Sequence, residues 1–138
     1  MSTEKDALAV FLGEWSATGT AYGADRQGAP WHSIHSARWH TGNFFIVQDE
    51  RANGPFDTLS VRGWDAERGT YFSWSIENHG FAREYLVTRD EATWTFTGAT
   101  ERATITFSDD GRTQTHHWEF TPDGEWITLC DRVATRVD

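Results

Sequence analysis

The sequence contains one cysteine and no long apolar run, and both shortages narrow the class of protein. Cys130 is the only cysteine among the 138 residues, so no disulfide can form within the chain. This usage fits a reducing compartment. No segment approaches the run of about 18 apolar residues that a membrane-spanning helix needs, and the first residues, MSTEKDALAV, are too charged for a secretory signal. We therefore expect a cytoplasmic protein without a transmembrane segment.

Basic residues are also scarce. The chain has 12 lysines and arginines against 21 acidic residues, which gives a formal net charge of −9. Such a surface repels phosphate backbones and anionic lipids, so we expect neither nucleic acid nor membrane as a partner. A length of 138 residues suits a single domain over 1–138 with its own core, as a monomer or a homodimer.

Aromatic side chains, in contrast, are abundant. The chain has 8 Trp, 9 Phe and 3 Tyr, or 14% of its residues. A tryptophan-rich interior is either built of large rings or encloses a cavity that such rings line.

One short helical pattern opens the chain, and ten alternating segments follow it. Apolar residues at helical spacing predict a helix over about 3–12, and Gly13 lets the chain turn into the first strand. Breaks rich in Gly, Asp, Asn and Pro separate the later segments, and SDDGR and TPDGE carry the Asp-Gly of a tight hairpin. The expected strands are 14–22, 31–39, 44–51, 58–64, 70–77, 81–87, 92–98, 101–107, 113–120 and 125–133.

Ten short strands joined by tight connections predict an all-β fold. An antiparallel up-and-down β-barrel of about ten strands is favoured, because closing the sheet removes its exposed edges. The short N-terminal helix would cover one end of the barrel. A sandwich of two sheets remains the alternative, since the sequence does not distinguish closure from face-to-face packing.

Three segments carry a resemblance to known barrels. FLGEWSATGT, RGWDAERGTYFSW and DGEWITLCDRV resemble a widespread bacterial family of unknown function with a calycin-like barrel, related to the lipocalins and fatty-acid-binding proteins. The opening is also similar to nitrobindin-like barrels, which place a haem-ligating histidine near the C-terminus. No histidine follows His117 here and the final strand offers only Cys130, so no cofactor is expected.

Alternation within each strand predicts which side chains face the interior. Trp94 and Phe96 mark the interior face of TWTFT, and the aromatic face of YFSWSIE places Trp74 inside. Polar residues on such faces point inward too, and burying one unpaired costs about 1–3 kcal/mol. Together with small side chains on the strands, they describe a ligand cavity. The candidate ligand-binding residues are His35, Trp74, Arg83, Tyr85, Trp94, Gln114, His116 and Trp118.

Arg83 and His116 are the expected polar contacts of the ligand. An arginine keeps its charge at any accessible pH, so in an apolar cavity Arg83 needs an anion. That anion is either the acid, enol or phenolate of a ligand, or a carboxylate of the chain such as Glu84, Glu101 or Glu119. His116 would share the same ligand oxygen.

Other chemistry finds little support. A metal site needs three or four converging ligands, and only His35, His116 and a carboxylate could supply them, so no metal is expected. Cys130 lies mid-strand and is expected to be a small buried side chain. No phosphate loop or dinucleotide motif occurs. Two functions remain: a module that binds an apolar or aromatic metabolite with an acidic or enolic group, or a cofactor-independent cyclase, isomerase or hydrolase acting on a similar ligand. No catalytic residue can be assigned.

Overall fold

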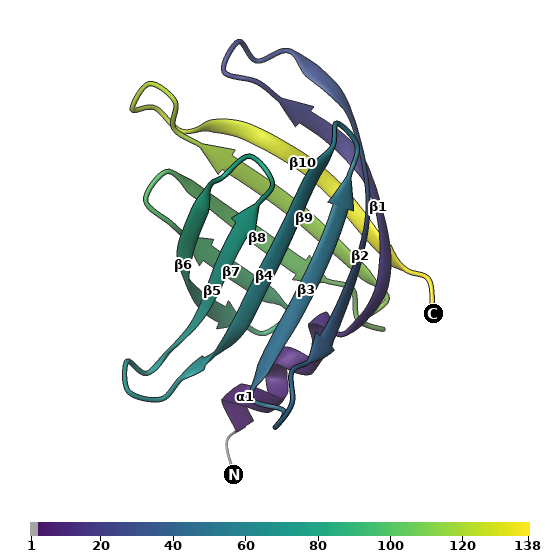
Figure 1. The fold of residues 1–138 in the computed structure, drawn as a ribbon, viewed down its shortest axis with the longest axis vertical. Helices are drawn as coiled ribbons and strands as arrows, with labels where there is room; N and C mark the ends of the chain where they lie inside the picture. Colours follow the sequence, from purple (N-terminus) through teal and green to yellow (C-terminus); the bar gives the residue numbers. More distant parts are fainter. Residues whose placement is uncertain (1–2) are drawn as a thin grey trace.

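The computed structural model describes residues 3–138 and contains ten antiparallel strands closed into a barrel (Figure 1). Each strand pairs with its neighbours in sequence, and β1 pairs with β10 to complete the ring. The predicted up-and-down barrel is therefore confirmed, and the sandwich alternative is wrong. The strands are β1 (Gly13–Tyr22), β2 (Gly28–Trp39), β3 (Phe45–Ala52), β4 (Phe56–Asp65), β5 (Thr70–Glu77), β6 (Ala82–Asp90), β7 (Thr93–Thr97), β8 (Glu101–Phe107), β9 (Thr113–Phe120) and β10 (Ile127–Arg136).

The predicted N-terminal helix covers one end of the barrel. α1 (Thr3–Ala7) continues as a 3-10 helix, η1 (Leu8–Phe11). The hydroxyl of Tyr71 on β5 donates a hydrogen bond of 2.6 Å to the carbonyl oxygen of Glu4, which ties the helix to the wall. Gly13 has φ +117°, a conformation that strains any other residue, and so turns the chain into β1. No helix within residues 3–138 is long and apolar enough to span a membrane.

The last strand runs further than the sequence predicts. β10 was expected over 125–133, whereas it extends to Arg136, because its end pairs with the start of β1 through Trp15 and Arg136. An irregularity in the pairing with β9 lies between Thr128 and Cys130. Closure of the barrel thus lengthens β10 and sets which of its side chains face inward.

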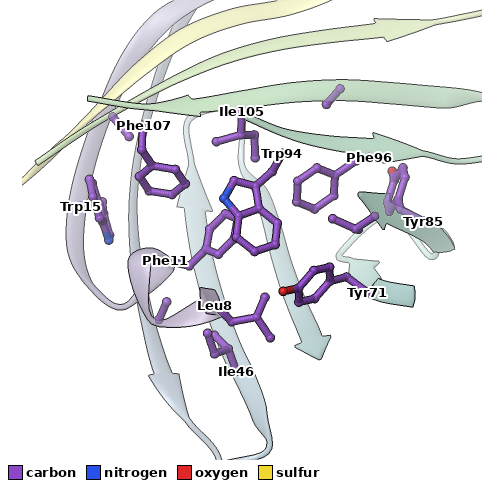
Figure 2. Close-up of a cluster of buried hydrophobic side chains, with 14 of the residues drawn as sticks. Leu8, Phe11, Trp15, Ile46, Tyr71, Tyr85, Trp94, Phe96, Ile105 and Phe107 are labelled. Atoms are coloured by element: carbon purple, nitrogen blue, oxygen red, sulfur yellow. The ribbon is translucent and has the colours of Figure 1, made fainter. Parts of the chain in front are cut away.

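Aromatic rings fill the interior near the helix (Figure 2). The ring of Phe11 is fully buried and meets Trp94 and Phe107 edge-on, with centroids 5.0 and 5.1 Å apart. Removing a side chain of this size from water stabilises the fold by about 1.5–3 kcal/mol. We call this region the apolar core; its large buried members are Leu8, Phe11, Trp15, Ile46, Tyr71, Trp94, Phe96, Ile105 and Phe107.

Candidate ligand-binding site

Beyond the apolar core, toward the end of the barrel that lies away from the helix (the open end), the interior becomes polar. Six strands send buried polar or charged side chains into this region, a density that ordinary cores avoid. We call the group the interior polar cluster: Ser33 and His35 on β2, Gln48 and Glu50 on β3, Arg62 on β4, Ser73 on β5, Gln114 and His116 on β9, and Arg132 on β10.

Arg62 is a buried cation whose direct polar partners are neutral. Its Nη1 donates to Gln48 Oε1 at 3.0 Å, and its Nε donates to Ser73 Oγ at 3.4 Å. The guanidinium carbon lies 4.8 Å from the centroid of the Phe11 ring and 5.1 Å from that of Phe96. Burial lowers the pKa of Arg62 to about 10, which still leaves it charged at neutral pH. Arg62 is thus a cation without a carboxylate in direct contact among residues 3–138.

Glu50 and Arg132 form the one ion pair of the cluster. Arg132 Nη2 lies 3.6 Å from Glu50 Oε1, and the Ser33 hydroxyl donates to Glu50 Oε2 at 2.8 Å. Burial alone would raise the pKa of Glu50, but Arg132, His35, Ser33 and Arg62 outweigh it and hold the pKa below its ordinary value. Glu50 is therefore an anion at neutral pH.

A glycine and two indoles position Arg132. Gly19 on β1 lies opposite Arg132, and a Cβ there would sit 2.6 Å from the Cα of Arg132, so only glycine lets the two strands approach. The guanidinium carbon lies 4.5 Å from the centroid of the Trp31 ring and 5.9 Å from that of Trp118. Such contacts attract the cation through the negative ring faces. Arg132 is thereby held over aromatic rings inside the barrel.

Two neutral imidazoles complete the cluster. His35 stacks on Trp15 at 6.0 Å between centroids, and burial lowers its pKa to about 4. Burial also lowers the pKa of His116, well below its ordinary value. His116 Nε2 donates to Gln114 Oε1 at 2.9 Å, and His116 Nδ1 accepts from Trp118 Nε1 at 3.4 Å, which together fix the tautomer. Both histidines are uncharged at pH 7.

Several buried polar atoms have no hydrogen-bond partner among the described residues. They are both ring nitrogens of His35 and the side-chain nitrogen of Gln114. Leaving a buried donor or acceptor unmatched costs about 1–3 kcal/mol, so native proteins rarely do so without a reason. His35 in particular can donate a hydrogen bond from its ring N–H, or accept one at its other ring nitrogen, without giving up an existing bond.

The charges of the cluster do not balance. Two guanidinium groups, Arg62 and Arg132, face one carboxylate, Glu50, while His35 and His116 are neutral. The interior polar cluster therefore carries one net positive charge. A buried charge is stable only when paired, so the arrangement is chemically suited to hold a monoanion.

A pocket of about 470 Å³ opens at the rim, between the start of β6 and the β7–β8 turn. Arg83 Nε lies 3.4 Å from Glu101 Oε2, and the Tyr85 hydroxyl donates to Glu101 Oε1 at 3.1 Å. The Tyr85 ring also meets the Trp118 indole edge-on at 5.7 Å, so Tyr85 separates this rim pocket from the interior polar cluster. Gly98 lines the pocket where a Cβ would collide with the Tyr85 ring at 2.9 Å.

Most of the sequence-predicted site residues face the interior, in three different places. His35, Gln114 and His116 belong to the interior polar cluster, and Trp118 packs beside it. Trp94 lies deep in the apolar core (Figure 2). The other three predicted residues are Tyr85 and Arg83, at the rim pocket, and Trp74.

Arg83 lies on the expected face of β6, but its counter-ion is within the chain. Its side chain is 31% exposed at the open end, and Glu101 supplies the anion. The alternative of an Arg–Glu pair is therefore observed in place of a free polar contact for a ligand. The β7–β8 hairpin brings Glu101 across from Arg83, and the segment FAREYLV alone contains no sign of this contact.

The inward orientation predicted for Trp74 is wrong, because its side chain is 48% exposed on the outer face of β5. The interior positions of this strand are instead Tyr71 and Ser73. Ser73 is small and polar because its hydroxyl accepts a hydrogen bond from Arg62. With polar residues inside and apolar ones outside, hydrophobic alternation points to the wrong face.

The charged members of the cluster were not identified from sequence. Glu50 lies in FIVQDERA, where acidic residues fall on both faces, so alternation carries no signal. Arg62 shares its face of β4 with Trp64, which packs against the apolar core, so alternation carried a signal for this residue that was not used. Alternation gave a weak indication that Arg132 faces inward, because it shares its face of β10 with the small buried residues Cys130 and Ala134.

The haem position that the nitrobindin resemblance implies does not fit these residues. The inward side chain that the last strand offers as a ligand is Cys130, and burial raises the pKa of its thiol, which favours the protonated form. His117 is half-exposed and faces Asp131 instead of the interior. Within residues 3–138, no group of three or more His, Cys, Asp and Glu side chains is arranged to hold a metal ion.

Comparisons with known proteins bear on the fold. No protein-family model matches this sequence, and no curated protein is significantly similar to it. The crystal structure of Rv2717c from M. tuberculosis matches with a TM-score of 0.73 at 13% identity, over 100% of this chain and 99% of that one. The S-type phycobiliprotein lyase CPES from Guillardia theta matches with a TM-score of 0.52 at 14% identity, over 100% and 94% of the two chains. The chain thus has the fold of the calycin-like ten-stranded barrels.

Proposed function

We propose that this protein binds a small apolar or aromatic molecule that carries one acidic or enolic group, with the anion at the interior polar cluster. The observation that carries the proposal is the excess of one buried positive charge over Glu50. A ligand anion supplies the counter-charge that Arg62 lacks, because its direct partners, Gln48 and Ser73, are neutral.

The surrounding groups suit the rest of such a ligand. His35 has two ring nitrogens available, so it can donate one hydrogen bond to the anion while staying neutral. The indole of Trp118 and the ring of Tyr85 form an aromatic wall between the cluster and the rim pocket. The indoles of Trp31 and Trp118, whose centroids lie 4.5 and 5.9 Å from the guanidinium carbon of Arg132, offer apolar faces beside the anion for the body of the ligand.

Calorimetric titration with a matched pair of probes tests the proposal. We expect 1-naphthoate to bind at least about tenfold more tightly than the uncharged 1-naphthylmethanol, because the two differ in the anionic group. Arg62→Met should remove this difference, because Glu50 then balances Arg132. The melting temperature should change little in net, because removal of the unmatched buried cation offsets the roughly 1–3 kcal/mol lost when the buried Gln48 Oε1 loses its donor.

Arg83→Met is the matched control at the rim. Its cation is paired with Glu101 and partly exposed, so both probes should bind as they do to the wild type. Equal affinity of the wild type for the two probes would refute the proposal. So would an Arg62→Met variant that keeps its preference for the anion.

A further inference from the structure

Trp118 determines which end of the Gln114 amide is left free. An indole N–H can only donate a hydrogen bond, so the bond of 3.4 Å from Trp118 Nε1 makes His116 Nδ1 an acceptor. The other nitrogen of this neutral ring, His116 Nε2, therefore carries the proton and donates to Gln114 Oε1 at 2.9 Å. Gln114 Nε2 is thus the free end of the amide, a donor without an acceptor among the described residues.

His35 provides the complementary atom. Its ring is neutral at pH 7, so one ring nitrogen bears a proton and the other accepts a hydrogen bond. Neither nitrogen has a partner within residues 3–138, and the proposed function uses the N–H, which donates to the anion of the ligand. The acceptor nitrogen of His35 then stays unmatched, as does the donor of Gln114. Besides burial and Arg132, His35 lowers the pKa of His116, so the two imidazoles lie within electrostatic reach of each other.

The stretch of wall between these two side chains is lined by methyl groups. Gln114 lies on β9 and His35 on β2, and the two strands between them, β10 and β1, contribute Ala134 and Ala17 on this row. Ala17 pairs in turn with Ser33, the inward-facing neighbour of His35 on β2. Both alanines are buried, and a methyl group fills little of the interior in front of it. A ligand group that lies over these methyl groups is flanked by Gln114 on one side and by His35 on the other.

We propose that Gln114 and His35 form a hydroxyl subsite, which makes the ligand a hydroxylated aromatic acid. This subsite rests on the proposed function, in which Arg62 holds the anion and His35 donates to it. A hydroxyl accepts a hydrogen bond at its oxygen and donates one from its proton, so it matches the amide donor of Gln114 and the ring acceptor of His35 together. A carbonyl only accepts and an ammonium only donates, so each would leave one of the two nitrogens unmatched.

The alternative occupant of the subsite is a trapped water. Bulk solvent cannot match these atoms, because Gln114 is 1% and His35 is 4% exposed. A single water has the same pattern of donor and acceptor as a hydroxyl. A ligand hydroxyl that displaces this water reproduces its hydrogen bonds and releases it to bulk solvent, so the affinity rises. A ligand without the hydroxyl gains nothing at this point.

Calorimetric titration compares 1-naphthoate with its isomers that carry a hydroxyl at position 3, 4, 5, 6 or 7. At positions 2 and 8 the hydroxyl would bond to the carboxylate of the same molecule, so those isomers are left out. We expect at least one isomer to bind the wild type about tenfold more tightly than 1-naphthoate does, since two hydrogen bonds form in a site shielded from water. In His35→Phe this gain should fall to about twofold or less, because the ring still stacks on Trp15 but offers no acceptor.

Each gain is the ratio of two dissociation constants for one variant, so the bond from His35 to the carboxylate cancels. Tyr85→Phe is the matched control: it also removes one polar group from a buried ring, but its hydroxyl donates to Glu101 at the rim. The gain in this variant should stay at about tenfold. Should His35→Phe fail to fold, the wild type alone serves, because the side-chain amide resonances of Gln114 should shift with the hydroxylated isomer and little with 1-naphthoate.

The outcomes separate the hydroxyl subsite from the proposed function. Equal affinity of the wild type for 1-naphthoate and 1-naphthylmethanol refutes the proposed function, and the subsite with it. A preference for 1-naphthoate without a gain from the hydroxyl at any position refutes the subsite alone and leaves a trapped water as its occupant. A gain that persists undiminished in His35→Phe, or that is lost in Tyr85→Phe, also overturns the subsite, because the hydroxyl then binds elsewhere.

Discussion

The two halves of the barrel interior differ in composition and in how well their side chains are paired. Near the helix, rings such as Phe11 and Trp94 meet edge to edge and are almost completely buried. Toward the open end, Arg62 lacks a direct counter-ion and His35 lacks hydrogen-bond partners. The first half lowers the free energy of the folded state, while the second half raises it in the absence of a partner. If stability were the only requirement, we would expect apolar side chains such as those of the apolar core to continue to the open end.

The largest expected effect is in the helix half. Phe11→Ala should lower the free energy of unfolding by about 3–5 kcal/mol, because it empties the centre of the apolar core. Urea denaturation measures the change. Phe44→Ala, at a side chain that is 60% exposed, should lower it by less than about 1 kcal/mol. Similar losses in both variants would mean that the helix does not close this end of the barrel.

The next effect belongs to the ion pair of the polar half. Glu50→Gln leaves Arg62 and Arg132 without a buried carboxylate and should lower the free energy of unfolding by about 3 kcal/mol. Adding 1-naphthoate should raise the melting temperature of this variant more than that of the wild type, because the probe replaces the lost anion. A variant as stable as the wild type would show that the interior charges are not coupled.

Lowering the pH should reduce the free energy of unfolding through His35, which lies in the same polar half of the interior. An unfolded histidine has a pKa near 6.5, whereas folded His35 has a pKa of about 4. Between these values the unfolded chain binds a proton that the folded chain does not, so the free energy of unfolding falls as the pH falls. From pH 7 to pH 5 His35 alone should account for about 2 kcal/mol.

Urea denaturation at both pH values checks this dependence. His35→Gln should reduce it, whereas His32→Asn, an exposed site on the same strand, should leave it unchanged. The account of His35 fails if the pH dependence of the wild type persists undiminished in His35→Gln.

The smallest effect is expected at the rim. The Arg83–Glu101 pair is partly exposed, and such pairs contribute less than about 1 kcal/mol. Arg83→Met should therefore shift the melting temperature little and change the affinity for 1-naphthoate by less than about twofold. A tenfold loss of affinity would mean that Arg83 contacts the ligand, and that the binding site is the rim pocket and not the interior polar cluster.

The fold was predictable because each local signal agreed with the next. Turn residues separated ten alternating segments, and the helical spacing before Gly13 marked the helix that covers one end. The length of β10 was not predictable, since its last residues are strand only because β1 lies beside them. Closure is a long-range contact that no local pattern encodes.

The site was half predictable, for a physical reason. His35, Gln114 and His116 share strand faces with aromatic residues, so alternation placed them inside. Glu50 shares its face with no aromatic residue, and it is stabilised inside by Ser33 on another strand. Arg62 does share its face with Trp64, but the partner that holds it inside, Gln48, lies on β3 and is not indicated by the sequence of β4. The same cross-strand dependence explains Trp74: where the interior is polar, the apolar face of a strand can be the outer one.

The central claim is that the unmatched charge of the interior holds the anion of a ligand. The most direct measurement follows the Nε–Hε resonances of the arginines by NMR while 1-naphthoate is titrated into the isotope-labelled wild type. The account predicts saturable shifts for Arg62 and Arg132 at the same probe concentration, with Arg83 little changed. Shifts confined to Arg83, or none at any of the three, would contradict it.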